Sequence, residues 1–259
     1  MNTKRVLQVE NITKNYGKGE NRTEALRGIS FDVLEGEFLG IMGPSGSGKT
    51  TLLNCISTMI KPTSGKILME GKDISTFKGS ELADYRGNEI GYIFQEFELL
   101  DNLTASENIT LPLLLHGLTG LQAEDKLREI AKLLDIVEVL RKFPSQMSGG
   151  QKQRVAAARA LISNPSIVLA DEPTGALDSK NSRILMEKLS AINKQNQKTI
   201  MMVTHNANAA CYCSRILFIQ DGRQVHELRK NIDTETNEKF YERIVTVMAQ
   251  LGGGSANVL

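Results

Sequence analysis

The chain has 259 residues, a net charge of +1 and a hydrophobic fraction of 41%. These values are typical of a globular protein with enough length to bury a core in one large or two small domains. The absence of a basic excess argues against a nucleic-acid partner, and no apolar run approaches the ~20 residues that a membrane-spanning helix needs. Because the N-terminus is polar and the three cysteines have no metal-ligand spacing, we expect no secretion and reduced thiols in the cytosol.

Two strands are predicted ahead of the first motif. Alternation of apolar and polar residues predicts an edge strand over residues 6–10, and a turn follows at residues 16–19. A second strand is expected at residues 26–33. Tyr16 in the turn could stack on a nucleobase through its aromatic face, and a packed or surface tyrosine explains the position equally well.

Residues 43–51, GPSGSGKTT, are here called the phosphate loop, and they follow a predicted buried strand at residues 38–42. The spacing G-x-x-x-x-G-K-[ST] suits phosphate binding, because small residues let backbone N–H groups and a helix N-terminus surround an anion. Lys49 is expected to contact the β- and γ-phosphates, and the Thr50 hydroxyl to bind Mg²⁺. A chance glycine-rich turn is disfavoured by the strand before and the helix after. The predicted nucleotide-binding residues are Gly43, Pro44, Ser45, Gly46, Ser47, Gly48, Lys49, Thr50 and Thr51.

Gln95 follows the next predicted core strand, at residues 90–94. Before it, the pattern indicates a short strand at residues 66–69 and a mixed, partly helical stretch at residues 73–86. An amide at the end of an apolar strand can reach Mg²⁺ or an attacking water, so Gln95 is a candidate catalytic and metal-binding residue. Taken alone, its position is ambiguous.

Helical periodicity dominates residues 96–165 and predicts a helical subdomain inserted between two core strands. An amphipathic stripe runs through residues 121–140. Ser148 is a good N-cap for a helix that reaches residue 162, and Gly149 and Gly150 permit close approach of the backbone to a ligand. Ser148, Gly149, Gly150 and Gln151, here called the signature segment, are therefore a second candidate anion site, although a simple cap would show the same pattern.

Two carboxylates follow the apolar run at residues 167–170. Asp171 and Glu172 stand where a buried strand ends, which is costly unless a cation or a reaction uses them. Asp171 suits a magnesium ligand, and Glu172 suits a general base for the attacking water. A solvated acidic turn is the competing interpretation, and the phosphate loop disfavours it.

The remaining elements alternate in the manner of an open α/β sheet. A helix at residues 181–194 precedes a core strand at residues 199–203, and His205 lies just past the carboxyl end of that strand, where such sheets bind ligands. A hairpin at residues 215–226, a polar linker at residues 231–238 and an amphipathic helix at residues 239–251 follow. We expect that helix to pack on its own domain and residues 252–259 to be flexible.

These motifs lie in a fixed order over nearly the whole chain. By their residues and their order, the chain resembles the ATP-binding subunits of ABC transporters. The resemblance implies an α/β P-loop fold with a RecA-like core sheet, an antiparallel β subdomain and an inserted helical subdomain. It places the ATPase domain at residues 1–230 and a C-terminal linker and helix at residues 231–259. It implies catalytic roles for Glu172, His205 and Gln95, binding of ATP with Mg²⁺, and Mg²⁺ ligands among Thr50, Gln95 and Asp171. Further nucleotide contacts are implied for Tyr16, Ser148, Gly149, Gly150, Gln151 and Asp178.

Within that family, the chain looks like the branch serving macrolide-export and lipoprotein-release permeases, and is similar to bacterial peptide-antibiotic resistance transporters of the bacitracin type. The residues that carry this likeness are the run at residues 94–108, the run at residues 175–180, the segment at residues 209–222 and the tail at residues 240–253. Two departures are visible: Met147 where Leu is common, a conservative change, and Asn206 where Asp is common, which removes a charge beside His205.

The resemblance also implies partners and a location. Two copies would clamp two ATP molecules head to tail, and a separate membrane permease would hold the dimer at the cytoplasmic face of the cell membrane. The bacitracin-type likeness adds a sensor histidine kinase as a candidate partner. The competing functions are the ATPase of a lipoprotein-release, macrolide-export or cell-division system, a non-transport ABC ATPase, and a scaffold that binds ATP without hydrolysing it.

Overall fold

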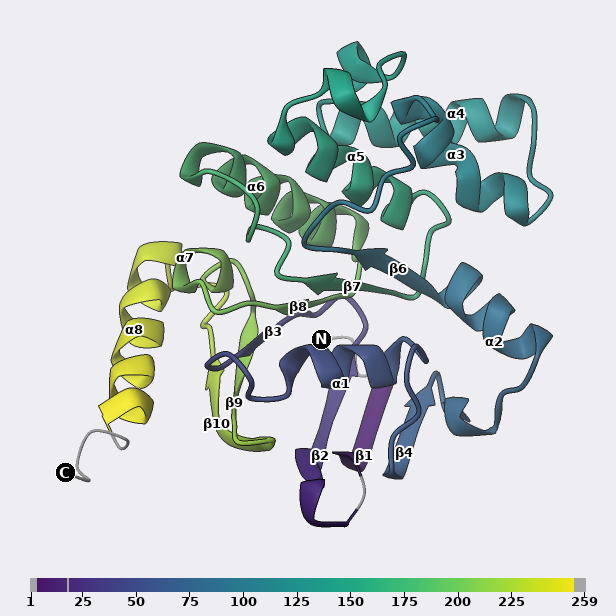
Figure 1. The fold of residues 1–259 in the computed structure, drawn as a ribbon. Helices are drawn as coiled ribbons and strands as arrows, with labels where there is room; N and C mark the ends of the chain where they lie inside the picture. The colour runs from purple at the N-terminus through teal and green to yellow at the C-terminus, as the bar shows by residue number, and fades with distance from the viewer. Residues whose placement is uncertain (1–3, 18, 254–259) are drawn as a thin grey trace.

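Two β-sheets form the framework of the chain, which the computed structural model describes over residues 4–17 and 19–253 (Figure 1). One sheet has the strand order β2-β1-β4-β5 and the other β10-β9-β3-β8-β7-β6. The strands are β1 Arg5–Tyr16, β2 Thr23–Leu34, β3 Phe38–Met42, β4 Ser64–Met69, β5 Lys72–Asp73, β6 Ile90–Ile93, β7 Ile167–Asp171, β8 Ile200–Val203, β9 Arg215–Gln220 and β10 Arg223–Arg229.

Helices occupy most of the remaining described chain. The α-helices are α1 Lys49–Ile56, α2 Ser80–Asp84, α3 Ala105–Leu115, α4 Leu121–Leu133, α5 Gly149–Leu161, α6 Ser179–Asn196, α7 Ala207–Ala210 and α8 Asn237–Gly253. Short 3-10 turns lie at Gly19–Asn21, Ile74–Thr76, Val137–Val139 and Pro144–Gln146, and a π turn lies at Tyr85–Glu89. No helix in the described part of the chain combines the length and the apolar character that a membrane crossing requires.

The four-stranded sheet is antiparallel, and the prediction of an edge strand at residues 6–10 was wrong. Leu7 pairs with Val33 of β2 on one side and with Met69 of β4 on the other, so β1 is an inner strand. Alternation of apolar and polar residues shows that one face of a strand is buried, but it does not show whether the strand pairs on one edge or on both. The strand also continues through Tyr16, so the turn begins one residue later, at Gly17 with φ 76°.

The six-stranded sheet is parallel over β9, β3, β8, β7 and β6, and β10 closes it as an antiparallel hairpin. All five residues of β3 and all four of β8 are buried, as strands covered on both faces require. Because parallel strands end at one edge of the sheet, the loops after β3, β6, β7 and β8 meet there.

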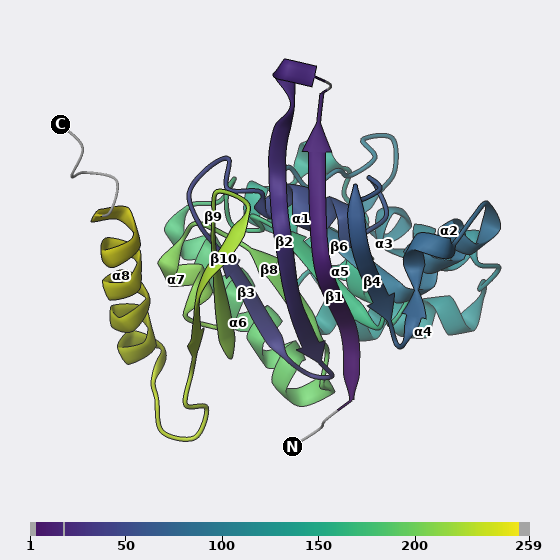
Figure 2. The ribbon, with the colours of Figure 1, turned by 90° about the horizontal axis from the view of Figure 1, so that it is seen from below.

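Helix α1 lies between the two sheets (Figures 1 and 2). Its Leu52, Leu53 and Ile56 are fully buried, in one cluster with Leu7 of β1 and Ile41 of β3. This packing fixes the direction in which the loop before α1 faces. A second core cluster lies beneath α3, α4, α5 and α6 on the opposite face of the six-stranded sheet.

Helix α4 ends earlier than the stripe over residues 121–140 predicts. It stops at Leu133, and Asp135 has a left-handed φ of 56° that breaks the helix before the 3-10 turn at Val137–Val139. The apolar residues beyond the break still face the core, since Ile136 and Val139 are fully buried. The apolar pattern therefore extends past the end of α4 into the 3-10 turn, and the pattern alone could not show where the helix ends.

Helix α8 packs on its own domain, as predicted. Phe240 and Ile244 are fully buried, and the cations of Lys230 and Arg243 lie 5.5 and 5.6 Å from the Phe240 ring centroid. Figure 2 shows α8 beside α7 at one end of the six-stranded sheet. Of the predicted flexible end, residues 254–259 lie outside the described residues, and Gly252 is within α8.

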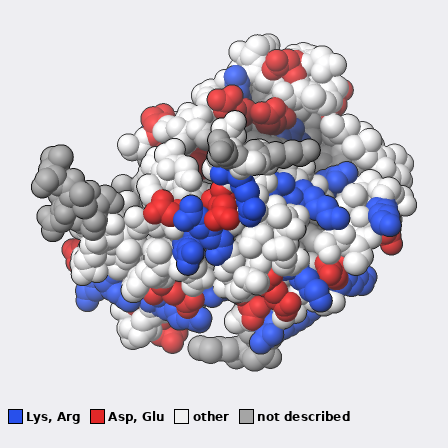
Figure 3. All heavy atoms as spheres, turned by 60° about the horizontal axis from the view of Figure 1, so that its bottom comes forward, with Lys and Arg blue, Asp and Glu red and all other residues white. Residues whose placement is uncertain are grey.

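Charge is finely mixed over the surface in view in Figure 3, where basic and acidic side chains stand next to one another. Exposed pairs such as Arg5 with Asp32 (Nε–Oδ2 3.1 Å) are of this kind, and each contributes little to stability. The three cysteines are free and buried, and burial raises the pKa of each thiol, to about 11 for Cys55. Packed, protonated thiols of this sort are structural.

Candidate functional site

The phosphate loop connects β3 to α1 in a conformation that depends on glycine. Gly48 has φ 102°, and a Cβ at this position would lie 2.4 Å from the Ala25 carbonyl oxygen, so no other residue fits without displacing β2. Gly48 is also the N-cap of α1, and no side chain in the described residues caps that helix. The first backbone N–H groups of α1 therefore face the space in front of the loop, as an anion site needs.

Lys49 spans the phosphate loop. Its Nζ donates to the carbonyl oxygens of Gly43 (2.9 Å) and Pro44 (2.8 Å), and the residue is only 7% exposed. Burial lowers the pKa of the Lys49 ammonium, and the nearby Glu172 and Asp171 carboxylates oppose that shift. An ammonium has three N–H donors, so the two loop carbonyls orient Nζ and leave a third donor for a phosphate oxygen.

Thr50 and Asp171 meet at the first turn of α1. The Thr50 hydroxyl donates to Asp171 Oδ1 at 3.2 Å, which joins α1 to the end of β7. Burial raises the pKa of the Asp171 carboxyl, while the Thr50 hydrogen bond and the charge of Lys49 lower it. A hydroxyl and a partly buried carboxylate are hard oxygen ligands, so this pair fits a Mg²⁺ ion that keeps water and phosphate oxygens as its other ligands.

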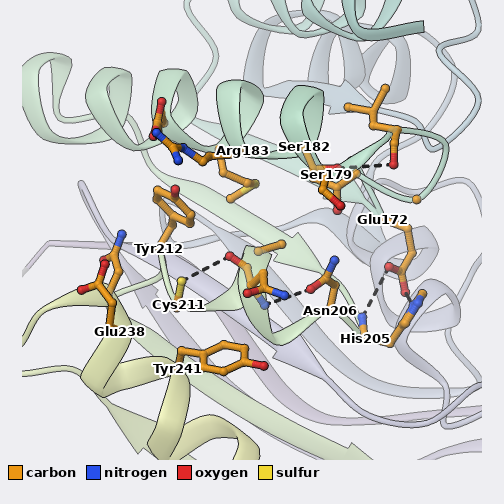
Figure 4. A pocket seen from close by; sticks show the side chains of 18 of the residues that line it. Glu172, Ser179, Ser182, Arg183, His205, Asn206, Cys211, Tyr212, Glu238 and Tyr241 are labelled. Atoms are coloured by element: carbon orange, nitrogen blue, oxygen red, sulfur yellow. Dashed lines mark hydrogen bonds and ion pairs between the residues drawn. The ribbon is translucent and has the colours of Figure 1, made fainter.

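Glu172 and His205 point toward one another from the ends of β7 and β8 (Figure 4). His205 Nδ1–H donates to Glu172 Oε1 at 2.9 Å, and the His205 backbone N–H donates to Oε2 at 3.4 Å. Glu172 has a left-handed φ of 46°, and its N–H donates to the Val203 carbonyl at 3.0 Å. The side chain of Glu172 is 15% exposed and that of His205 69%, so the carboxylate is shielded and the imidazole faces outward.

A groove of about 1000 Å³ begins at Glu172 and His205 and runs between α6, α7 and α8 (Figure 4). Gln95 lines the same end, and a Cβ on Gly175 would lie 3.0 Å from its Nε2, so the amide packs directly over that glycine. The structure thus gathers Gln95, Glu172 and His205 in one place. The magnesium-ligand role of Gln95 remains a prediction.

The signature segment forms the N-terminus of α5 and caps itself. Ser148 Oγ accepts from the Gln151 N–H at 3.3 Å, and Gln151 Oε1 accepts from the Ser148 N–H at 3.0 Å. A Cβ on Gly149 would have no neighbour closer than 3.8 Å, whereas one on Gly150 would lie 2.0 Å from Asn181 Oδ1. A methyl group at Gly149 would therefore make only ordinary van der Waals contacts, whereas Gly150 is needed for close packing against Asn181.

Asp178 caps α6 beside the signature segment. Its Oδ1 accepts from the Asn181 N–H at 2.8 Å and its Oδ2 from Asn181 Nδ2 at 2.7 Å, and these bonds hold the pKa of the Asp178 carboxyl below its usual value. Asn181 is thus shared between Asp178 and the packing of Gly150. The predicted start of this helix at residue 181 was two residues late, since Asp178 caps a helix that begins at Ser179.

The predicted site residues fall into three groups. The phosphate loop, Thr50, Asp171, Glu172, His205 and Gln95 collect at the carboxyl edge of the parallel strands. The signature segment and Asp178 lie at the N-termini of α5 and α6, and no hydrogen bond or ion pair between described residues joins them to Lys49 or Thr50. Tyr16 stands at the end of β1, 43% exposed, with Lys14 Nζ 5.1 Å from its ring centroid.

Gln153 is the residue that sequence reasoning missed. It is fully buried on α5, and its Nε2 donates to the carbonyl oxygens of Phe94 (3.0 Å) and Pro173 (2.7 Å). One signal was present: Gln153 occupies the face of α5 that also buries Ala156 and Ala157, and a buried amide must have partners. The identity of those partners, which come from two distant loops, needs the structure.

Comparisons with known proteins agree with this arrangement. Residues 26–175 match the family model described as ABC transporter. The chain is 47% identical over 248 residues to the bacitracin export ATP-binding protein BceA of Halalkalibacterium halodurans, a match that covers 96% of this chain and 97% of that protein. It is 41% identical over 220 residues to the lipoprotein-releasing system ATP-binding protein LolD of Geobacter metallireducens, which covers 85% and 98%.

A solved structure extends the comparison to three dimensions. The dimeric post-hydrolysis state of the ATP-binding cassette MJ0796, a protein of Methanocaldococcus jannaschii, bound to ADP and Pi, superposes with a TM-score of 0.79 at 40% identity. The match covers 86% of this chain and 98% of that one. Sequence and fold therefore point to the same group of proteins.

Proposed function

Since this chain belongs to the ABC transporter family and is an ATP-hydrolysing subunit of such a transporter, we propose that it powers a membrane permease for resistance to peptide antibiotics of the bacitracin type. The observation that carries the proposal is the length of the match. The bacitracin export relative covers 96% of this chain, whereas the lipoprotein-releasing relative covers 85%. The longer match supports a function in common with the bacitracin export relative. The shorter match supports only an ATPase domain in common with the lipoprotein-releasing relative.

The residues of the site have distinct tasks in the proposed reaction. Lys49 and the backbone of the phosphate loop bind the β- and γ-phosphates of ATP. Glu172 orients the attacking water and accepts its proton, and His205, held by the 2.9 Å bond to Glu172, contacts the γ-phosphate. Thr50 and Asp171, and Gln95 as a further candidate, would hold Mg²⁺, whose charge offsets that of the phosphate oxygens.

The proposed working unit is a homodimer. Ser148 and Gly149 of one copy face the γ-phosphate bound by Lys49 of the other, so closure of two copies surrounds each ATP. The relative of known structure is dimeric, and the separation of the signature segment from Lys49 within one chain is what such a shared site requires. Hydrolysis removes the γ-phosphate between the copies, and their separation drives the permease.

Partners and location follow from this role. The permease would hold the dimer at the cytoplasmic face of the cell membrane, and the helical region over residues 96–165 would transmit the motion. A sensor histidine kinase is a further proposed partner, on the likeness to bacitracin-type systems. Lipoprotein release is the second candidate function, and the 41% identity to LolD favours it over macrolide export and cell division.

A growth assay tests the proposed substrate class. Loss of this chain from its source cells should increase sensitivity to bacitracin, and plasmid-borne wild type should restore growth while Glu172→Gln should not. The matched control is a set of antibiotics that are not peptides, for which sensitivity should stay unchanged. Unaltered bacitracin sensitivity together with impaired release of lipoproteins would reject the resistance role in favour of the second candidate.

A further inference from the structure

Gln153 joins three parts of the chain that carry proposed site residues. It lies on α5, five residues after Ser148, and its amide holds the Phe94 carbonyl just before Gln95 and the Pro173 carbonyl just after Glu172. We propose that Gln153 is a positioning residue that couples the signature segment to Gln95 and Glu172 of the same chain. The inference rests on the proposed function, because it concerns how one copy links the two shared sites.

The chemistry of the contact fixes how the amide is turned. Two backbone carbonyl oxygens can only accept hydrogen bonds, so the Gln153 NH₂ group must face both, one N–H to each. Gln153 Oε1 is buried and has no hydrogen-bond partner among the described residues. Burial of an unpaired oxygen is costly, so the two hydrogen bonds donated by the amide must offset that cost. The N–H donors are therefore the part of Gln153 that the structure uses.

The carbonyl groups of Phe94 and Pro173 lie beyond the paired residues of β6 and β7. The pairing of β6 with β7 ends at Ile93 and Ala170, so Phe94 and Pro173 lie beyond the last pair. Gln153 therefore continues the connection between the two strand ends after the ladder stops. It sets the separation of the backbones that carry Gln95 and Glu172.

The same helix also holds the far end of the segment after Gln95. The Arg159 guanidinium donates to the Phe97 carbonyl at 2.9 Å and to the Glu98 carbonyl. Phe97 and Glu98 have left-handed φ values of 65° and 48°, a strained pair that needs such support. Because α5 grips the segment at both ends, a shift of α5 must move the segment or break these bonds.

In the proposed dimer this connection crosses from one ATP to the other. The signature segment serves the nucleotide bound by the second copy, whereas Gln95 and Glu172 serve the nucleotide bound by their own chain. A movement of α5 on engagement of the second copy would thus reach Gln95 and Glu172 through Gln153. In this proposal, Gln153 makes the two hydrolysis sites depend on one another.

Steady-state ATPase kinetics of the purified full chain test the assignment. We expect Gln153→Met, which keeps the length of the side chain and removes both donors, to lower kcat at least ~10-fold, since small misplacements of catalytic groups are costly. Its ATP affinity as a monomer should stay within ~2-fold, and its Hill coefficient should fall toward one. Val155→Ala, a fully buried apolar change on the same helix, is the matched control and should keep wild-type kcat and cooperativity.

A second variant separates positioning from a general loss of packing. Gln153→Glu keeps the shape but offers no donor when ionised, and it regains one O–H donor when the introduced carboxyl is protonated. Burial raises the pKa of such a carboxyl, so the kcat of this variant relative to wild type should rise as the pH falls from ~8.5 to ~6.5. A purely structural role predicts that this ratio follows only the folded fraction of the variant, which urea denaturation at the same pH values measures.

The outcomes distinguish this inference from the proposed function. If wild type neither dimerises with ATP nor hydrolyses it cooperatively, the proposed function fails. If wild type is cooperative and Gln153→Met retains both kcat and the Hill coefficient, the positioning role is overturned. A Gln153→Met enzyme that is slow yet fully cooperative, or a flat pH ratio for Gln153→Glu, would also count against the coupling.

Discussion

The N-termini of α1 and α5 both carry predicted nucleotide contacts, and they differ in how their backbone donors are used. At α1 the N-cap is Gly48, which supplies no capping side chain, and Lys49 stands in the first turn. At α5 the Ser148 and Gln151 side chains satisfy each other's backbone N–H groups. The N–H groups at the start of α1 therefore have no side-chain partner among the described residues and can bind an anion. At α5, only the N–H groups of Gly149 and Gly150 remain without such a partner in that part of the chain.

The contrast supports the proposal that the N-terminus of α1 binds nucleotide within one chain, whereas that of α5 needs a second copy. The phosphate loop adds a buried cation, a hydroxyl and two carboxylates within reach of its open donors. The signature segment adds the N–H groups of Gly149 and Gly150 and no cation, and a Cβ at Gly149 would meet only ordinary contacts at 3.8 Å or more. The N–H groups of Gly149 and Gly150 can add hydrogen bonds to a phosphate whose cationic partners lie in another chain. In the proposed dimer, the second copy supplies those partners.

The largest expected effect concerns Glu172→Gln, which should separate binding from hydrolysis. Loss of the general base should lower turnover at least ~10²-fold while the phosphate loop still binds ATP. Because the γ-phosphate then persists, the variant should become a stable dimer with ATP and remain a monomer with ADP.

Multi-angle light scattering with each nucleotide, paired with a phosphate-release assay, measures both effects. Wild type with ATP is the control, and should form dimers only transiently. A variant that stays monomeric with ATP would show that the signature segment does not complete the site of a second copy. Near-normal turnover would remove Glu172 from its proposed role.

The next prediction compares the two helix ends directly. Lys49→Ala removes a charge-assisted hydrogen bond to phosphate, worth about 1.5–3 kcal/mol, so the monomer should bind ATP ~10- to 100-fold more weakly. Ser148→Ala should leave that affinity within ~2-fold, because Ser148 serves the other copy. Isothermal titration of the monomer measures both, and equal losses in the two variants would contradict the division of tasks.

Much of this site was visible in the sequence because it rests on local chemistry. The phosphate loop, the strand ends that carry Asp171 and Glu172, and the cap at Ser148 each depend on a few adjacent residues, and the comparisons confirm the family and the fold. The two acidic residues were noticed because carboxylates rarely end a buried strand. The roles given to these residues remain predictions.

What the sequence could not show depends on contacts between distant segments. The alternation in β1 did not reveal that β4, more than fifty residues later, would pair with its free side. The amide of Gln153 reaches carbonyls 59 and 20 residues away, on two different loops. Such placements follow from the topology of the sheet, which a local pattern does not encode.

The smallest expected effect lies within the signature segment itself and separates its two glycines. Gly150→Ala places a methyl group 2.0 Å from Asn181 Oδ1, and we expect the unfolding free energy to fall by about 1–3 kcal/mol as Asn181 loses its fit to Asp178. Gly149→Ala meets nothing closer than 3.8 Å, so stability should be unchanged or slightly higher, since alanine favours helix. Urea denaturation of the two variants gives these values.

The same pair then tests the approach of a second copy. The methyl group of Gly149→Ala would contact Phe97 and Leu177 of its own chain at 3.8 and 3.9 Å. In the proposed dimer we still expect it to narrow the space in which a phosphate of the other copy approaches the Gly149 backbone, so this stable variant should hydrolyse ATP slowly and dimerise poorly when combined with Glu172→Gln. Gly150→Ala buries its methyl group against α6, away from that space, and at low temperature it should keep more of the activity. If the less stable variant were also the less active one, Gly149 would have no special part in the approach of a second copy, and its glycine would serve the helix terminus alone.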